Sequence, residues 1–258
     1  MEKMIKHLGR FARETIANLG HASRSFFGMI GNVAPLWRRP QLVFDQVHFI
    51  GNYSMMIITI AGLFVGFVLG YLGFYALNDY GAGESLGVLV ALALVRELGP
   101  VMTALLFAGR AGTSLTAEIG LMKANEQLSA MEMMAVNPAQ RVIAPRFVAG
   151  ILAMPVLSLV FCAMGIIGGY LVGVELIGVD NGAFWSQMQA KVDVMKDIGN
   201  GVIKSIVFGF AVTFVALYQG YEAMPTPEGV ARATTRTVVI SSLLVLWLDF
   251  LLTAWMFQ

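Results

Sequence analysis

Four ionisable residues lie inside long apolar stretches of the sequence: Arg96, Glu97, Lys204 and Asp249. Insertion scales put the cost of one charge near the centre of a bilayer at about 3 kcal/mol, so four facing lipid would cost roughly 10–14 kcal/mol. That sum is comparable to the stability of a whole domain, so these side chains must face protein, water or a polar ligand. Two interpretations are open: ion pairs that join helices, or a polar patch lining a binding cavity.

The spacing of these charges predicts which of them can meet. Lys204 lies about six residues, or ~9 Å, from the start of its stretch, and Asp249 about nine residues, or ~13 Å, from the end of its own. The two can therefore pair if their helices touch. Arg96 and Glu97 are consecutive, so their side chains point about 100° apart and do not face each other. Pro100 removes the helical hydrogen bond to the Arg96 carbonyl and predicts a kink beside this charged pair.

The composition and the apolar stretches predict the fold class. Of the 258 residues, 57% are hydrophobic and 13% charged, about half the charged share of a soluble domain. Five stretches reach the roughly 20 residues that span a bilayer, at about 53–77, 85–107, 147–174, 198–221 and 238–257. We predict an all-α polytopic membrane protein with one domain over residues 1–258, in which 1–49 lead into a five-span region, 50–258. The net charge of +1 gives no reason to expect a nucleic-acid partner.

The basic residues predict the topology. With the N-terminus in the cytoplasm, most of the 17 Lys and Arg residues fall on the cytoplasmic side. Only Lys191 and Lys196 lie on the outer side, and Arg96 and Lys204 lie inside spans. Cytoplasmic loops carry such an excess, so the C-terminus is expected on the outer side. Within residues 1–40, large apolar residues recur every three or four positions among seven basic ones. We expect an amphipathic helix lying in the membrane interface there, the alternative being a disordered basic tail.

Glycine stripes in two spans predict close helix packing. Gly62, Gly66 and Gly70 recur at four-residue intervals in the first span, and Gly165, Gly169 and Gly173 in the third. Such spacing leaves a groove in which another backbone can approach. The stripes could pack within one chain or between two chains.

The segment between the second and third spans predicts an amphipathic helix at about 116–136 on the cytoplasmic side. Glu118, Met122 and Glu126 are spaced to share one face, and Asn137-Pro138 would end the helix. A helix that projects into the cytoplasm could be the element that a partner ATPase binds and moves. The alternative is a helix that lies on the membrane surface. The chain itself has no G-x-x-x-x-G-K-[ST] loop, so nucleotide would bind a partner.

Four segments carry a resemblance to a known family. They are Arg96-Glu97-Leu98-Gly99-Pro100, Gly109-Arg110-x-Gly112, Ala117-Glu118-Ile119-Gly120-x-Met122-x-x-x-Glu126-Gln127-x-x-Ala130-Met131, and Ala233-Thr234-Thr235-Arg236-Thr237. This pattern resembles the MlaE family, the permease subunits of bacterial Mla-type phospholipid ABC transporters. The resemblance implies a non-catalytic inner-membrane subunit that moves glycerophospholipids between the inner and outer membranes of a Gram-negative bacterium. It also implies four partners: a second copy of the chain, a cytoplasmic ATPase that binds ATP and Mg, a periplasmic MCE-domain ring and a small STAS-domain protein.

With that resemblance, the candidate residues take roles. We expect Arg96, Glu97, Lys204 and Asp249 to line a lipid cavity, with Arg96 or Lys204 on the lipid phosphate and Glu97 balancing that charge or meeting a cationic head group. Tyr80 is a further candidate at the outer mouth, because tyrosine suits an apolar site with one wet end.

Two further sets of residues have expected roles. Glu118, Met122 and Glu126 would contact the ATPase. Five spans are too few to enclose a two-chain lipid, so a homodimer is expected, with Gly62, Gly66 and Gly70 as a candidate contact.

Two other function classes were weighed. A self-contained secondary transporter or channel fits five spans poorly and leaves the cytoplasmic helix without a role. An intramembrane enzyme is disfavoured because His7, His21 and His48 all precede the first span, so no histidine can join a serine or a metal inside the membrane.

Overall fold

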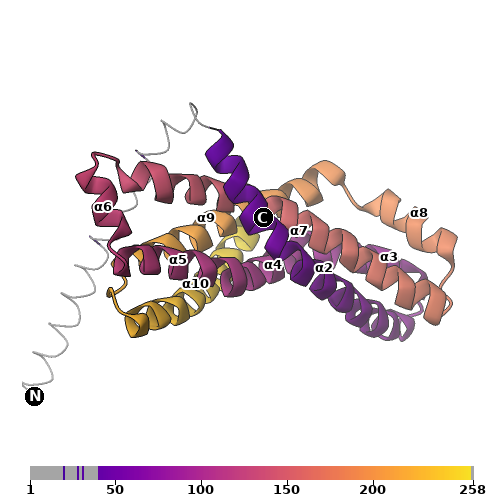
Figure 1. Cartoon of the computed structure of the whole chain (residues 1–258). Coiled ribbons are helices and arrows are strands. Elements are labelled where there is room, and N and C mark those ends of the chain that lie inside the picture. The colour runs from indigo at the N-terminus through magenta and orange to yellow at the C-terminus, as the bar shows by residue number, and fades with distance from the viewer. Residues whose placement is uncertain (1–19, 21–27, 29–30, 32–39, 257–258) are drawn as a thin grey trace, which may run out of the picture.

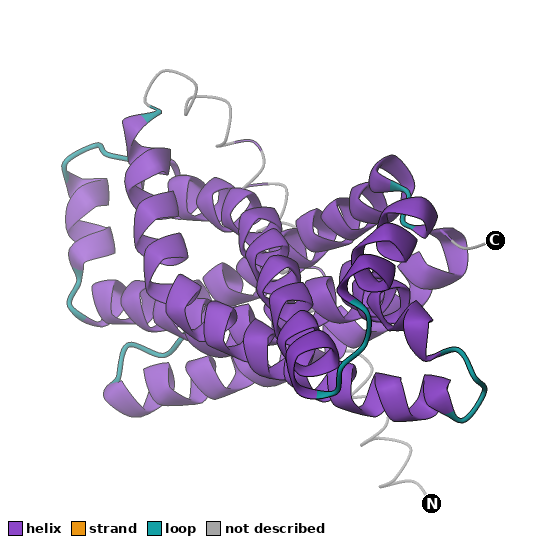
Figure 2. Cartoon of the chain, turned by 90° about the vertical axis from the view of Figure 1, so that its right-hand side faces the viewer, coloured by secondary structure: helices purple, strands orange, loops and turns teal. Residues whose placement is uncertain are grey.

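The computed structural model describes residues 20, 28, 31 and 40–256, and the regular elements among them are all helices (Figures 1 and 2). The predicted interfacial helix within residues 1–40 lies outside the described residues, apart from these isolated positions and Pro40. The elements in chain order are α2 (Gln41–Asn78), η2 (Gly83–Ser85), α3 (Leu86–Ala93), η3 (Leu94–Leu98), α4 (Gly99–Phe107), η4 (Ala108–Gly112), α5 (Thr113–Ala124), α6 (Gln127–Met133), η5 (Ala139–Ile143), α7 (Ala144–Tyr170), η6 (Leu171–Leu176), α8 (Asn181–Lys191), η7 (Val194–Ile198), α9 (Gly199–Glu222) and α10 (Pro227–Met256).

Five helical runs are long and apolar enough to cross a membrane, which confirms the predicted number of spans. They are Gln41–Asn78, Gly83–Ala124, Ala139–Leu176, Val194–Glu222 and Pro227–Met256. Several runs are longer than the apolar stretches alone predicted. The first run begins 12 residues before residue 53. Pro40 is the N-cap of α2, and the residues that follow Pro40, several of them polar, already belong to the helix.

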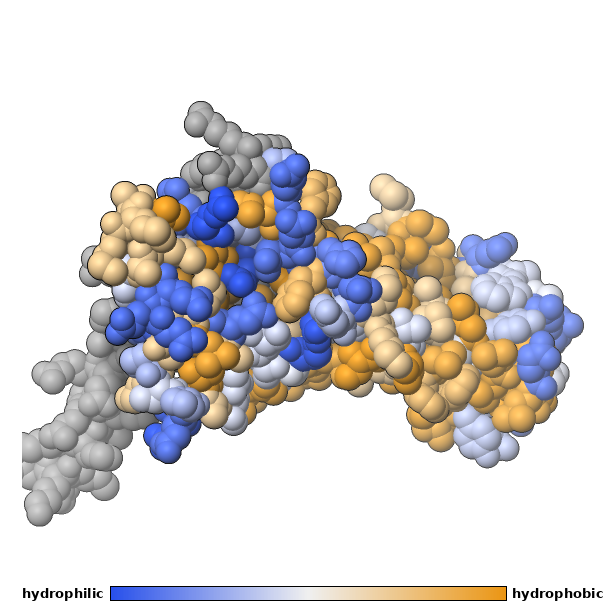
Figure 3. Space-filling model, in the orientation of Figure 1, coloured by the Kyte–Doolittle hydropathy of each residue, from blue (hydrophilic) through white to orange (hydrophobic). Residues whose placement is uncertain are grey.

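The two ends of the helical bundle differ in their balance of charge, because acidic residues accompany basic ones at one end and outnumber them at the other. We call the end with Lys123, Arg141, Arg146, Arg232 and Arg236 the basic end; it carries α6. The opposite end, with Asp79, Glu84, Glu175, Asp180 and Asp193, is called the acidic end and carries α8. In Figure 3, hydrophilic residues gather around the end that carries α6 and at the tip beyond α8, while hydrophobic residues cover much of the surface between. This distribution suits a chain whose middle lies in lipid and whose ends meet water.

The predicted helix over residues 116–136 is wrong in its extent. The second span continues without interruption through α5, whose Leu115, Thr116 and Ile119 are buried against α9 and α10. The helix then stops, because Glu126 adopts a left-handed conformation with φ of 57°, and α6 follows as a separate short helix. The first half of the predicted helix is therefore part of the bundle, and only residues after 124 project from it.

The glycine stripes of α2 and α7 pack against each other within one chain. A Cβ atom added at Gly66 would overlap the Gly165 carbonyl, and one at Gly62 or Gly70 would press on the carbonyl of Phe161 or Gly169. Of the two interpretations left open, packing within one chain is the one observed. Gly66 therefore does not report on a contact between two chains.

We expect Gly66→Ala to destabilise the protein, because the added methyl group must push α2 and α7 apart. Overpacking of this kind costs about 1–3 kcal/mol. The matched control is Gly51→Ala on the same helix, where an added Cβ meets nothing within 4 Å and alanine favours the helix. Thermal unfolding of the two purified variants in one detergent tests this. Equal unfolding midpoints would contradict the tight α2–α7 contact.

Candidate functional site

Lys204 of α9 is completely buried and lies at the centre of the intramembrane charges. Its Nζ donates to Glu97 Oε2 at 2.8 Å, Asp249 Oδ1 at 3.1 Å, Thr253 Oγ1 at 2.7 Å and the Arg96 carbonyl at 3.1 Å. The Lys204–Asp249 pair expected from the depths of the two residues is thus present. We call Glu97, Lys204, Asp249 and Thr253 the lysine cluster.

Pro100 explains why a backbone carbonyl is available to the lysine. Proline has no N–H, so the carbonyl four residues earlier, that of Arg96, loses its helical partner. The backbone there widens into the π-helical segment η3, and Gly99 N–H bonds to the Leu94 carbonyl. Such one-turn π segments occur often at functional sites. The Lys204 ammonium therefore satisfies an acceptor that the sequence of the second span leaves open.

Thr253 belongs to the site, although the sequence analysis did not predict a role for it. Its hydroxyl accepts from Lys204 and donates to Glu97 Oε1 at 3.1 Å. It lies four residues after Asp249, so both project from one face of α10. This i, i+4 spacing is the signal from which it could have been found.

Arg96 pairs with Asp197, which directly precedes the apolar stretch predicted at about 198–221. Its Nε and Nη2 contact Asp197 Oδ1 at 2.8 and 2.7 Å. Asp197 is buried and also accepts the Asp193 N–H at 2.9 Å. Asp197 lies in η7, which extends the fourth span toward the acidic end. Arg96 and Glu97 thus reach different partners, as their 100° separation predicts.

Exposure decides which of these groups could meet a ligand. The Lys204 side chain has no exposed surface, whereas Arg96, Glu97 and Asp249 are 34%, 37% and 21% exposed. A lysine ammonium has three protons, and four protein acceptors already surround it. Lys204 therefore offers no exposed surface to a lipid phosphate, and it acts here by holding the two carboxylates.

The remaining candidates lie elsewhere. Tyr80 is 88% exposed on the turn after α2, and its side chain makes no hydrogen bond or ring contact among the residues described; its role stays a prediction. Glu118 is paired with Arg146 Nη2 at 3.1 Å and accepts from Ser114. Met122 packs on the small core around Ile119, whereas Glu126 is exposed on the turn. The three expected coupling residues therefore share no free face.

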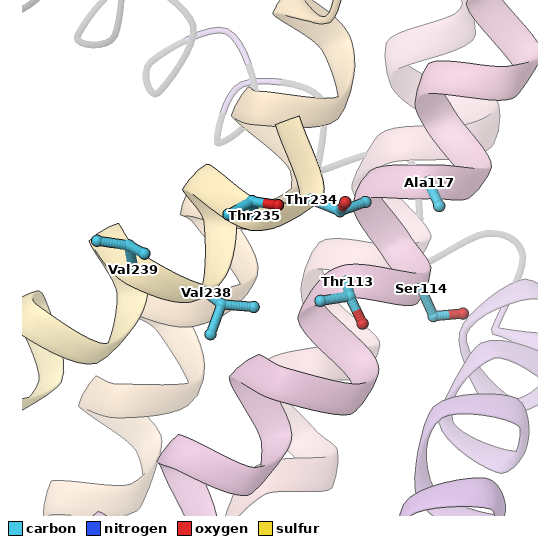
Figure 4. Close-up of a pocket in the computed structure, with 7 residues that line it drawn as sticks. All are labelled: Thr113, Ser114, Ala117, Thr234, Thr235, Val238 and Val239. Carbon is cyan, nitrogen blue, oxygen red and sulfur yellow. The ribbon is translucent and has the colours of Figure 1, made fainter. Parts of the chain in front are cut away.

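A surface hollow of about 550 Å³ lies between parts of α5 and α10 toward the basic end (Figure 4). Four hydroxyl-bearing side chains and three apolar ones line it, namely Thr113, Ser114, Thr234, Thr235, Ala117, Val238 and Val239. Beside it, the buried Thr116 and Thr237 hydroxyls lie 2.8 Å apart, and Thr116 also lies 2.9 Å from the Ala216 carbonyl of α9. These contacts join α5, α9 and α10 where the two helices in Figure 4 approach.

Within the part of the chain that the structure describes, no three His, Cys, Asp or Glu residues could hold a metal ion. Five helices long and apolar enough to cross a membrane, three of them joined by an ion network, define a polytopic α-helical membrane protein. The sequence model of the family Permease MlaE matches residues 43–255, and the chain belongs to that family.

Curated relatives agree with the family match. The chain is 56% identical to the intermembrane phospholipid transport system permease protein MlaE of Haemophilus influenzae, over 98% of this chain and 97% of that protein. It is 36% identical to a probable ABC transporter permease protein of Rickettsia typhi, over 84% and 83% of the two chains. It is 33% identical to a probable ABC transporter permease protein of Synechocystis, over 83% and 81%.

We expect Lys204→Met to destabilise the fold by about 3 kcal/mol, the lower end of the cost of breaking a buried ion network. Two carboxylates would lose their cation, and their partial exposure limits the loss. Adding Asp249→Asn should restore part of the stability by removing one of those charges. Lys196→Met, at an exposed position, is the control. Unfolding midpoints of the three variants test this, and an unchanged midpoint for Lys204→Met would contradict it.

Proposed function

We propose that this chain is the membrane-spanning permease subunit of an ABC transporter that moves glycerophospholipids between the inner and outer membranes of a Gram-negative bacterium. The observation that carries the proposal is the near full-length similarity to a relative named as an intermembrane phospholipid transport permease. The lysine cluster supports it, since partly exposed charges inside apolar spans suit a substrate with an ionic head group and apolar chains. The chain is non-catalytic in this proposal and needs no cofactor of its own.

The proposed orientation puts the basic end in the cytoplasm of the inner membrane and the acidic end in the periplasm. The positive-inside rule supports this assignment. In that orientation the lysine cluster lies in the periplasmic half of the bundle, α6 is cytoplasmic, and α8 is periplasmic. The family resemblance adds a periplasmic MCE-domain ring and a small STAS-domain protein as proposed partners.

A second copy of the chain is the proposed partner of α10. In the described residues, only 17% of the most apolar window of α10 is buried, against 61% in the run that contains α9. Large apolar side chains on this outer face include Leu243, Trp247 and Phe250. A second copy packed there would cover the hollow of Figure 4 and place Glu97 and Asp249 of both copies around a shared cavity.

The ATPase would bind at α6 and the turns around it. Glu126 and Glu132 are exposed, and Met133 and Met134 are 84% and 68% exposed. Methionine gives adaptable apolar contacts, and α6 projects from the bundle where α5 ends. Glu118, being paired with Arg146, would transmit movement to α7 rather than touch the ATPase.

Reconstitution tests the function as a whole. The chain and its ATPase, in donor liposomes carrying a labelled phospholipid, should export label to an acceptor only with ATP and both subunits present. Donor liposomes without the ATPase are the control. ATP-independent lipid or ion flux through the chain alone would overturn the proposal in favour of a secondary transporter or channel.

We expect Glu126→Lys combined with Glu132→Lys to release the ATPase, because both charges lie on the exposed α6 region. Co-purification of the ATPase with the tagged chain should fall at least tenfold, while the chain stays inserted and folded. The control is Glu228→Lys, since Glu228 is also exposed at the basic end but lies on α10. Equal ATPase recovery from the double variant and the control would exclude α6 as the docking element.

A further inference from the structure

We propose that the lysine cluster binds the ammonium group of a zwitterionic phospholipid, so that the site prefers amine-bearing head groups over anionic ones. This inference rests on the proposed function and adds the head-group class. It starts from five ionisable groups in this part of the bundle: Arg96, Asp197, Lys204, Glu97 and Asp249.

The charges do not cancel. Arg96 and Asp197 form a neutral pair at 2.7 Å. Lys204 alone faces both Glu97 and Asp249, at 2.8 and 3.1 Å. With all three ionised, the lysine cluster carries one negative charge in excess. Helix pairing alone does not require that second carboxylate, because the Thr253 hydroxyl and the Arg96 carbonyl already accept from Lys204.

The exposed atoms of the lysine cluster are acceptors rather than donors. Lys204 is enclosed, and the Thr253 hydroxyl points its proton at Glu97. Asp249 uses Oδ1 for Lys204, lies within hydrogen-bonding reach of the Glu97 carboxylate, and is 21% exposed. Glu97 is 37% exposed, and its Oε1 accepts from Thr253. The two carboxylates thus offer lone pairs outward while a buried cation fixes them from behind.

A ligand that suits this arrangement brings a positive charge and N–H donors into an apolar region. The primary ammonium of an ethanolamine head group has both, and hydrogen bonds to charged groups are the strong ones. A quaternary ammonium keeps the charge but loses the donors. A glycerol head group brings neither, and its phosphate adds a negative charge to a cluster already negative. The expected order of binding is therefore ethanolamine, then choline, then glycerol.

The test uses the full chain with its co-purifying subunits in nanodiscs of equal parts phosphatidylethanolamine, phosphatidylcholine and phosphatidylglycerol. Tightly bound lipid is then released and identified by mass spectrometry. We expect phosphatidylethanolamine to exceed phosphatidylglycerol about tenfold, the lower end for a hydrogen bond to a charged group. Asp249→Asn makes the cluster neutral at almost constant shape and should bring the ratio close to one. Asp79→Asn, at an exposed carboxylate on the turn after α2, should keep it.

The outcomes separate this inference from the proposed function. Equal retention of the two lipids by the unaltered chain overturns the amine preference and leaves phospholipid transport intact. An unchanged ratio in Asp249→Asn also overturns it. Absence of any retained lipid, together with no ATP-dependent transfer, overturns the proposed function itself. Free ethanolamine at millimolar concentration should not displace the lipid; if it does, the amine site belongs to a soluble amine instead.

Discussion

The burial of one lysine ammonium inside the bilayer is the constraint on which this part of the structure depends. A cation with no exposed surface must be neutralised and hydrogen-bonded by protein. Lys204, on the fourth span, meets that demand with groups from two others: the second gives Glu97 and the Arg96 carbonyl, and the fifth gives Asp249 and Thr253. The need to neutralise this buried cation accounts for three features. They are Pro100, the π-helical segment before it, and the pair Asp249 and Thr253 on α10. The cluster thereby ties α9, η3 and α10 together without relying on apolar contact.

The chain uses a different principle where α2 meets α7. In lipid there is no hydrophobic force between helices, and close backbone approach must supply the attraction. Gly62, Gly66 and Gly70 bring the α2 backbone onto carbonyl groups of α7. The bundle therefore contains a pair held by backbone packing and a group, α5, α9 and α10, held by buried hydroxyls and charges (Figure 1). The second kind of contact is directional, so it can exist in two discrete arrangements, which suits a moving part better than glycine packing does.

The sequence predicted features that depend on local composition and missed those that depend on distant partners. The five spans follow from apolar length, and the Lys204–Asp249 pair follows from depth along antiparallel helices. The partner of Arg96 lies 101 residues away in a segment that reads as a loop, so periodicity could not identify it. Glycine spacing predicted a close contact but not its partner, because each stripe fits any smooth surface. The break at Glu126 was missed because a left-handed glutamate is unusual, and the buried face of α5 stops the helix from projecting further.

A row of residues that winds slowly around α10 links the two ends of the bundle. Thr237, Ser241, Val245, Asp249 and Thr253 recur at four-residue intervals along it, and the first three are fully buried. Thr237 meets Thr116 of α5, while Asp249 and Thr253 meet Lys204 of α9, roughly 18–24 Å further along the helix. In the proposed transporter, α6 joins the ATPase to α5, and α5 is joined to α10 through two hydroxyls. A rotation of α10 about its axis would remove Thr237 from Thr116 and Asp249 from Lys204 together, because one continuous helix carries both residues. Movement of α6 at the basic end could thus change the charge presented by the lysine cluster, with one continuous helix, α10, as the connection.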